Sequence, residues 1–368
     1  MTDGRVSSAG SPGQQVTSAA MPRVLVVGHH IFPDTFEWHI VETFRRMGHV
    51  TEFFESAVRM GPTPYKVQQA LKKLNQAFLR EPERLFEKRM LRAVQRFQPN
   101  LVLVTLGSQL SPKSVQRLRG ITTARIVCWC QDQMTTLGRQ YLLGSEYDAV
   151  FVKDRHLQDL FSRMIKSTAF FYLPEACNPQ VHRSVALSAG DEKRFGCDVM
   201  IAGTLYYYRQ EILRHLAGVE LKVWGLQPGW LLGRLKRQSL PPVFMEEKAR
   251  AAKAARICLN TLHYGEVNGL NARAFEIAGC GGFQLLTSVP VLAEHFDIDR
   301  EVVAFNSLDE LLEKVRYYLD HPQMAAAIAA RGQLRAHRDH TYETRLQSLL
   351  RITFGATEAP PLVSSPAR

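Results

Sequence analysis

Hydrophobic and polar positions follow one repeated pattern along most of this chain. Short runs of β-branched and other apolar residues alternate with amphipathic stretches, which is typical of a parallel sheet covered by helices. The runs are almost continuously apolar, as expected for strands buried on both faces of a sheet. In the first half the pattern predicts strands at 23–28, 50–54, 101–105, 125–129, 149–152 and 169–173.

A second series of the same kind begins after a Pro-, Ser- and Gly-bearing stretch at 174–196, which we interpret as a joint between domains. It predicts strands at 198–203, 221–225, 257–261, 283–286 and 302–305. We therefore expect an α/β fold of two facing, doubly wound Rossmann-like domains with a cleft at the carboxyl ends of their strands. The expected parts are a disordered leader (1–20), an N-terminal domain (21–178), a C-terminal domain (179–335), a C-terminal helix (336–354) and a disordered tail (355–368).

The charge balance favours an anionic partner. The chain has a formal net charge of +11, which suits a nucleotide phosphate, a nucleic acid or an acidic membrane surface. No recognised nucleic-acid-binding module appears, so we do not expect nucleic acid. No apolar run approaches the roughly 20 residues that span a bilayer. The six cysteines lie mostly in apolar segments without C-x-x-C spacing, which favours reduced core thiols and a cytoplasmic location.

Two basic segments have two interpretations each. Residues 65–97 and 230–237 combine Lys and Arg with apolar residues. The first interpretation is a set of amphipathic helices whose basic face is solvated. The second is a surface for peripheral contact with anionic lipid at the inner face of a membrane, or for an acidic acceptor.

The most informative segment is 260–286, which reads as a strand, a Gly/Asn-rich loop, a helix and another strand. Backbone N–H groups of such a loop can converge on an anion at the helix N-terminus. Arg273 in the first helical turn can bind phosphate oxygens, and Glu276 follows on the same face. The alternative is a surface Arg–Glu ion pair that contributes little to stability. The loop residues with the required conformational freedom include Asn268, Gly269 and Asn271.

Several motifs are missing. No G-x-G-x-x-G follows Gly28 and no P-loop is present, which disfavours dehydrogenases and P-loop enzymes. The D-x-D at 297–299 falls in a predicted surface loop, and the histidines lack metal-ligand spacing. We therefore predict no metal site and no cofactor.

Beyond these patterns, the C-terminal half resembles the CgeB-like, family-1-type glycosyltransferases of the GT-B fold. The resemblance is carried by ICLN (257–260), RAFEIAGCGGFQLLT (273–287), EVVAFNSLDELLEKVRYYLDHP (301–322) and HTYETR (340–345), and upstream by IAGTLYYYRQEIL (201–213) and YLPEACNPQVH (172–182). It implies a nucleoside-diphosphate-sugar donor in the C-terminal domain, an acceptor in the N-terminal domain and catalysis without a metal. The resemblance assigns the diphosphate to Arg209 and Arg273, the ribose to Glu276, and the base to Val243 and Phe244.

One position departs from the family. Many retaining relatives carry a second glutamate eight positions before the ribose-binding one, where this chain has Asn268. Glu266 lies two residues away from that position. The departure leaves open whether the configuration at the sugar is inverted or retained.

On the acceptor side, His29 and His30 follow the first strand, where an imidazole can activate a hydroxyl. Asp132 is the carboxylate alternative, and Glu175 lies at the joint. All four also fit ordinary turn, cap or surface roles.

These features together favour a glycosyltransferase acting on a hydroxyl of a glycan, protein or lipid acceptor. The alternatives are a catalytically silent sugar-binding or scaffold protein of an envelope or spore-coat pathway, and a nucleotide-sugar epimerase.

Overall fold

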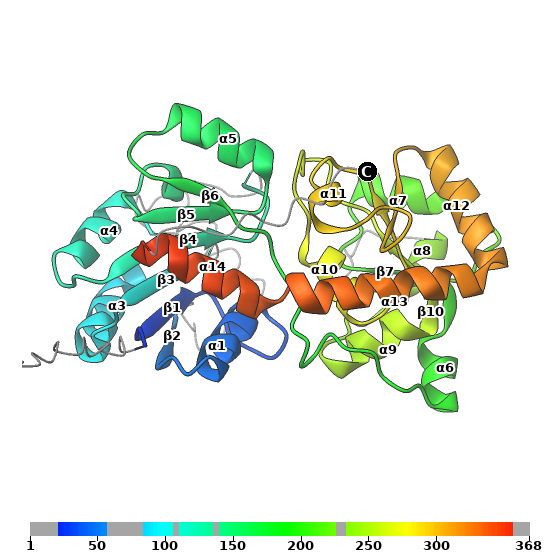
Figure 1. Ribbon diagram of the computed structural model, residues 1–368, viewed down its shortest axis with the longest axis horizontal. Helices are drawn as coiled ribbons and strands as arrows, with labels where there is room; N and C mark the ends of the chain where they lie inside the picture. The colour runs from blue at the N-terminus through cyan, green and yellow to red at the C-terminus, as the bar shows by residue number, and fades with distance from the viewer. Residues whose placement is uncertain (1–20, 57–83, 106–109, 135–139, 226–232, 356–368) are drawn as a thin grey trace, which may run out of the picture.

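The computed structural model describes residues 21–56, 84–105, 110–134, 140–225 and 233–355. Two six-stranded sheets form the two halves of the molecule, and every strand pairing within them is parallel (Figure 1). The N-terminal sheet has the order β2-β1-β3-β4-β5-β6, and the C-terminal sheet has the order β12-β11-β10-β7-β8-β9.

The N-terminal sheet is covered by helices on both faces. One face packs on α3, α4 and α5, and the other packs on α1 and on α14 from the end of the chain. The strands are β1 (Val24–Gly28), β2 (Thr51–Glu55), β3 (Leu101–Thr105), β4 (Arg125–Cys130), β5 (Ala149–Val152) and β6 (Phe170–Tyr172). The helices are α1 (Phe36–Arg46), α3 (Arg84–Phe97), α4 (Pro112–Arg119) and α5 (Arg155–Met164), with a short 3-10 helix η3 (Tyr141–Leu143).

The C-terminal sheet is likewise packed on both faces, by α7, α8 and α12 on one and by α6, α9, α10 and α11 on the other, while α13 packs with helices of both faces. Its strands are β7 (Cys197–Ala202), β8 (Leu221–Trp224), β9 (Ser239–Leu240), β10 (Ala255–Asn260), β11 (Gln284–Thr287) and β12 (Val303–Phe305). The helices are α6 (Ala189–Phe195), α7 (Tyr207–Arg214), α8 (Gly233–Arg237), α9 (Glu246–Ala254), α10 (Ala272–Gly279), α11 (Leu292–His295), α12 (Leu308–Asp320) and α13 (Pro322–Asp339).

The last helix, α14 (Tyr342–Phe354), returns to the N-terminal half (Figure 1). The segment 336–354, expected to be one helix, holds the end of α13, a break at His340 and Thr341, and α14. Thr341 caps α14, because its side chain accepts from the Thr344 N–H. Arg345 is buried and donates to the carbonyls of Pro174 and Glu175, so the HTYETR motif fastens α14 to the joint between the halves.

The alternating pattern correctly predicted eleven of these strands, ten of them to within one residue at each end and β10 to within two. The two-residue strand β9 and helix α6, which lies inside the expected joint, were missed. The capping box of Ser188 and Asp191 is the local signal for α6. The expected leader at 1–20, the tail after Gly355, the basic region before Arg84 and residues 230–232 lie outside the described residues.

The six cysteines are all buried and unpaired, as the sequence predicts. Among the helices that the structure describes, none has the length and apolar character needed to cross a bilayer.

Candidate active site

A polar cavity of about 470 Å³ lies between the two halves. The N-terminal half contributes residues that follow β4, β5 and β6: Asp132, Gln133, Lys153 and Glu175. The C-terminal half contributes Gly203, Thr204, Tyr206, Arg209, His263, Glu266, Asn271, Ala272, Arg273 and Glu276. The cavity therefore lies at the carboxyl ends of strands from both sheets, where open α/β sheets bind ligands.

A second, mainly apolar cavity of about 300 Å³ lies within the C-terminal half. It is lined by side chains around the ends of β7 and β8 and along α9 and α10: Met200, Ala202, Gly203, Thr204, Trp224, Gly225, Pro242, Val243, Phe244, Lys248, Ala252, Arg273, Glu276, Ile277 and Cys280. Gly203, Thr204, Arg273 and Glu276 line both cavities, so the two are neighbours across these residues.

The strand order explains this position. The chain runs outward from β7 through β8 to β9 and then returns to β10 on the other side of β7. The connections after β7 and β10 therefore diverge in opposite directions, which opens a crevice at the point of reversal. Gly203 and Thr204 follow β7, and Thr261 and His263 follow β10.

Two arginines converge at this crevice. Arg209, in the first turn of α7, is buried and donates to the carbonyl of Thr204 and to both the hydroxyl and the carbonyl of Thr261. Burial, with the neighbouring charge of Arg273, lowers the pKa of Arg209 to about 10. The guanidinium of Arg273 has no hydrogen-bond or ion-pair partner among the residues that the structure describes. Two adjacent cations, one of them unpaired, favour binding of an anion.

Gly203 permits the close approach of these cations. Its φ of +104° lies in the region that favours glycine, and a Cβ here would lie 2.8 Å from Nη1 of Arg273. A side chain at position 203 would therefore obstruct the guanidinium that faces both cavities.

The N-terminus of α10 borders the polar cavity. Asn271 caps the helix by accepting from the Ala274 N–H, and its amide is paired with that of Asn260 through two hydrogen bonds of 3.0 Å. The backbone N–H of Ala272, the first residue of α10, donates to Oε2 of Glu175 over 3.0 Å. A carboxylate of the joint thus lies at the helix end that the sequence predicts to bind an anion.

Buried charges form the opposite wall. Lys153 donates to Glu266 over 2.6 Å and lies 3.7 Å from Glu175. Burial lowers the pKa of Lys153, but the charges of Glu175 and Glu266 outweigh it, so the pKa is raised and the amine stays protonated. Burial raises the pKa of Glu175 to about 8 against the opposing charge of Lys153, and the charges of Asp132, Glu276 and Glu266 contribute to the rise. Oε2 of Glu266 is buried without a hydrogen-bond partner in the described part of the chain.

Known proteins share this architecture. Residues 209–351, less than half of the chain, match a family described as glycosyl transferase-like. No curated protein matches the sequence. Among solved structures, sucrose-phosphate synthase from Thermosynechococcus elongatus matches with a TM-score of 0.65 at 13% identity, covering 91% of this chain and 100% of that chain. HepE from Anabaena in complex with UDP and glucose gives 0.64 at 11% identity, covering 90% and 98%. A glycosyltransferase from Rickettsia africae gives 0.61 at 10% identity, covering 91% and 98%.

The fold is GT-B. The predicted fold class is therefore confirmed, and the region 209–351 is glycosyl transferase-like.

Most of the residues predicted to bind the donor line the GT-B cavities. Arg209 and Asn271 line the polar cavity, Val243 and Phe244 line the apolar one, and Arg273 and Glu276 line both. Glu276 is mostly buried, and burial raises its pKa, but the charge of Lys248 and the nearby imidazole of His182 outweigh this and hold the carboxyl ionised.

Asn268 and Gly269 lie elsewhere. The Asn268 side chain accepts from the Val291 N–H over 2.7 Å, and its own N–H donates to Asp154. A Cβ on Gly269 would lie 2.8 Å from the carbonyl oxygen of Lys153. Both residues therefore belong to a contact between the halves and line neither cavity. Their polar, small character, which suggested an anion loop, serves close packing instead.

Of the acceptor-side candidates, Asp132 and Glu175 line the polar cavity, whereas His29 and His30 line neither cavity. His30 is half-exposed and pairs with Glu55 at the end of β2 over 3.0 Å. The histidines follow β1, while the N-terminal wall of the cavity comes from β4 to β6.

Sequence reasoning missed Lys153 and Lys248. Lys153 follows the apolar run of β5 directly, so the rule that ligands lie beyond the carboxyl ends of strands could have identified it. Lys248 carries no such signal, because it lies on a charged helix that resembles any surface helix.

One group of described side chains brings possible metal ligands together. The ligand atoms of Asp34, His39, His182 and Glu276 lie within 4.8 Å of one another. Nδ1 of each histidine accepts a hydrogen bond from Asn178, through its side-chain amide for His39 and its backbone N–H for His182. The amide orientation is fixed, because its oxygen accepts from the Gln180 N–H. Each neutral imidazole therefore carries its proton on Nε2, the atom that a metal would need, and the group does not fit a metal ion.

Proposed function

We propose that this protein is a glycosyltransferase that transfers a sugar from a nucleoside-diphosphate sugar to a hydroxyl acceptor without a bound metal ion. The observation that carries the proposal is the pair of Arg209 and Arg273, held at the boundary between an apolar and a polar cavity. A donor has the same order of parts: an apolar base, a dianionic linker and a polar sugar. That HepE was solved with UDP and glucose on the same fold supports the proposal.

The donor is placed by matching chemistry. The base enters the apolar cavity beside Val243 and Phe244, and the ribose hydroxyls donate to Glu276. The diphosphate faces Arg273 and Arg209, and the sugar enters the polar cavity. There, Oε2 of Glu266 is a buried acceptor without a partner among the described residues, which suits a sugar hydroxyl. Glu266 thereby supplies the carboxylate that position 268 lacks.

The reaction breaks the bond between the anomeric carbon and the diphosphate oxygen and forms a bond to the acceptor oxygen. The electron pair of the broken bond leaves on the diphosphate, whose charge the two arginines stabilise. We assign acceptance of the hydroxyl proton to Asp132, because it lines the polar cavity, whereas His29 and His30 do not. Glu175 also lines this cavity, but burial raises its pKa to about 8, so it holds a proton near neutral pH. The arginines supply the positive charge at the leaving group, so the step needs no metal.

Further details rest on the sequence resemblance. We propose membership in the CgeB-like group from the motifs at 273–287 and 340–345, a hexose as the transferred sugar, and a cytoplasmic site of action. The division into an acceptor-binding N-terminal domain and a donor-binding C-terminal domain belongs to the same proposal.

The test is a release assay with UDP-, GDP-, ADP- and dTDP-sugars, each with and without EDTA. Slow release of one free nucleoside diphosphate that survives EDTA is expected. A changed sugar with no release would indicate an epimerase. Binding of a nucleotide sugar without either reaction would indicate a silent relative, and no binding of any of them would refute the proposal.

A further inference from the structure

The loop between β1 and α1 contacts the segment that lines the apolar cavity. The ring of Phe32 meets that of Phe244 edge to face, with centroids 6.5 Å apart. Two residues further on, Oδ2 of Asp34 accepts a hydrogen bond from the Met245 N–H over 2.9 Å. Met245 occupies the N-cap position of α9, so a carboxylate from the N-terminal half caps a helix of the C-terminal half.

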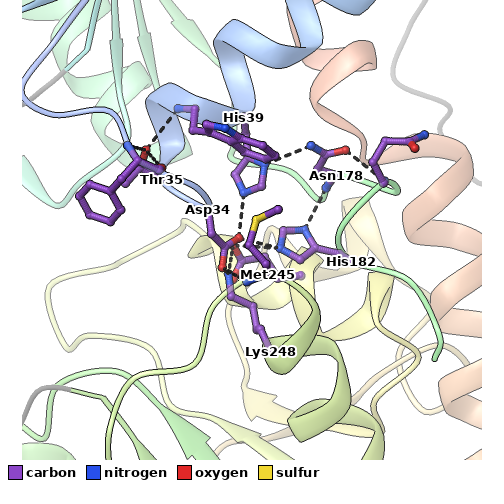
Figure 2. A network of polar contacts seen from close by, with 11 residues as sticks. Asp34, Thr35, His39, Asn178, His182, Met245 and Lys248 are labelled. Carbon is purple, nitrogen blue, oxygen red and sulfur yellow. Dashed lines mark hydrogen bonds and ion pairs between the residues drawn. The ribbon is translucent and has the colours of Figure 1, made fainter. Parts of the chain in front are cut away.

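The Asp34 carboxylate is fully buried and surrounded by donors (Figure 2). Lys248 lies 3.0 Å from Oδ2, and Nε2 of His39 lies 3.1 Å from Oδ1. Nε2 of His182 lies 3.5 Å from Oδ1. Burial raises the pKa of Asp34, but the close imidazole of His182, the hydrogen bond from His39 and the charge of Lys248 outweigh it and hold the pKa well below its usual value. Asp34 is therefore a buried anion with a full set of partners.

Lys248 connects this anion to the donor cavity. Its Nζ lies 3.0 Å from Asp34 and also 3.0 Å from Oε1 of Glu276, which lines both cavities. Burial lowers the pKa of Lys248, but the two carboxylates outweigh it and raise the pKa. A continuous chain of charges thus runs from the N-terminal half through Lys248 to Glu276.

The backbone at both ends of this contact is unusual. Asp34 has a φ of +74° and Met245 a φ of +53°, values that residues other than glycine seldom adopt. Such conformations persist where surrounding contacts hold them, and they cluster at functional sites. The two strained residues here contact each other directly.

We propose that Asp34 is a positioning residue for the nucleoside end of the donor. It holds Met245 and Lys248 across the boundary between the halves, and through Lys248 it fixes the orientation of Glu276 beside the apolar cavity. Nucleoside binding and the mutual arrangement of the halves are then thermodynamically coupled, each strengthening the other. The inference rests on the proposed function for the identity of the ligand.

The experiment compares two ligands on the full-length chain by calorimetry. One ligand is the nucleoside diphosphate among UDP, GDP, ADP and dTDP that binds the wild-type protein, and the other is inorganic pyrophosphate. Asp34→Asn keeps an oxygen for the Met245 N–H but removes the charge that Lys248 pairs with. We expect at least about tenfold weaker binding of the nucleoside diphosphate. Pyrophosphate, which needs only the arginines, should bind as it does to the wild type.

Two further variants make the test decisive. Lys248→Gln keeps the contacts of Asp34 with the Met245 N–H and with both imidazoles, so it is expected to fold. It should show the same selective loss of nucleoside-diphosphate affinity. This variant is the test if Asp34→Asn does not fold. Glu294→Gln is the matched control, because it breaks the Arg155–Glu294 pair (2.6 Å), which also joins the two halves but lies outside both cavities. Its nucleotide affinity should equal that of the wild type.

Three results would overturn the inference while leaving the proposed function intact: unchanged nucleotide affinity in Asp34→Asn and Lys248→Gln, an equal loss for pyrophosphate, or an equal loss in Glu294→Gln. A wild-type protein that binds neither a nucleoside diphosphate nor pyrophosphate would instead refute the proposed function, and this inference with it.

Discussion

The two sheets differ at the point where the order of their strands reverses. In the C-terminal sheet this point lies between β7 and β10, and both cavities open there. In the N-terminal sheet it lies between β1 and β3, and the buried side chain of Glu37 occupies it, accepting from the Thr105 hydroxyl over 2.8 Å. A Cβ on Gly28 would lie 2.5 Å from Cγ of Glu37, so no space is left between them.

The difference shows that equivalent topology does not imply equivalent use. The C-terminal crevice is open and contains an unpaired guanidinium, whereas the N-terminal one is filled by a carboxyl whose pKa burial raises. The N-terminal half instead lines the polar cavity with Asp132, Lys153 and Glu175, which follow β4, β5 and β6. Under the proposed function, the C-terminal half binds the anionic part of the donor, and the N-terminal half presents groups able to exchange protons.

Removing the cation of the open crevice should have the largest effect. Arg273→Ala deletes charge-assisted hydrogen bonds to the diphosphate, each worth about 1.5–3 kcal/mol, so nucleoside-diphosphate affinity should fall roughly 10- to 100-fold. Thermal stability should stay near that of the wild type, because no described residue is hydrogen-bonded to this guanidinium. Calorimetry and thermal unfolding measure the two quantities.

Arg273→Lys is the matched control for this change. It keeps the charge and loses the planar fork, so its affinity should fall between those of the wild type and Arg273→Ala. If Arg273→Ala bound nucleoside diphosphates as tightly as the wild type, the contrast between the two crevices would have no functional meaning.

The buried carboxyl of Glu175, in the N-terminal wall of the polar cavity, should make the stability of the protein depend on pH. Because burial raises the pKa of Glu175 from 4.5 to about 8, the folded chain holds a proton that the unfolded chain releases. The contribution of this group to the free energy of unfolding is complete below pH 4.5 and is lost as pH rises to about 8. Glu175→Gln is neutral throughout and should flatten that decline in chemical unfolding between about pH 5.5 and about pH 8.5.

The same ionisation should weaken diphosphate binding, since it places a negative charge at the N-terminus of α10. Pyrophosphate affinity of the wild type should therefore fall toward pH 8.5 more than that of Glu175→Gln. Parallel pH profiles for the two proteins, in both unfolding and binding, would show that Glu175 does not titrate in this range.

Asn268 should give the smallest effect on binding. Asn268→Ala leaves the partly buried Val291 N–H without its acceptor, at a cost to stability of about 1–3 kcal/mol. Nucleoside-diphosphate affinity should not change, because the side chain lines neither cavity. The exposed neighbour Val267, replaced by Ala, serves as control and should alter neither quantity. A loss of affinity without a loss of stability would place Asn268 in the ligand site.

The sheets were predictable from sequence because each depends on local patterning. Runs such as 101–105 and 149–152 are short, apolar and β-branched, so their type and bounds follow from burial on two faces. Strand β9 consists of Ser239 and Leu240 alone, and its pairing with β8 depends on tertiary contact that no local signal records. The return of α14 to the other half is likewise a tertiary choice.

The site was predictable where it follows the rule that ligands bind beyond strand ends. Arg209 lies in the first turn of the helix that follows β7, and Arg273 lies in the first turn of the helix that follows β10. The structure brings the two side chains together at the polar cavity. Asp34, His182 and Lys248 belong to three different parts of the chain, and their convergence depends on how the halves dock. Asn268 shows the opposite failure: small polar residues suit both an anion loop and a tight packing contact, and sequence does not separate the two.

The path of α14 has a practical consequence for dissecting the protein. Tyr342, Leu346 and Leu349 complete the core against one face of the N-terminal sheet, although the chain reaches them only after finishing the other half. A fragment ending at the joint would expose that apolar face and is expected to aggregate. A chimera designed to exchange donor specificity should therefore replace only the segment from the joint to about Asp339. It should keep the N-terminal half and α14 from the same parent protein, with one crossover point at each end of the replaced segment.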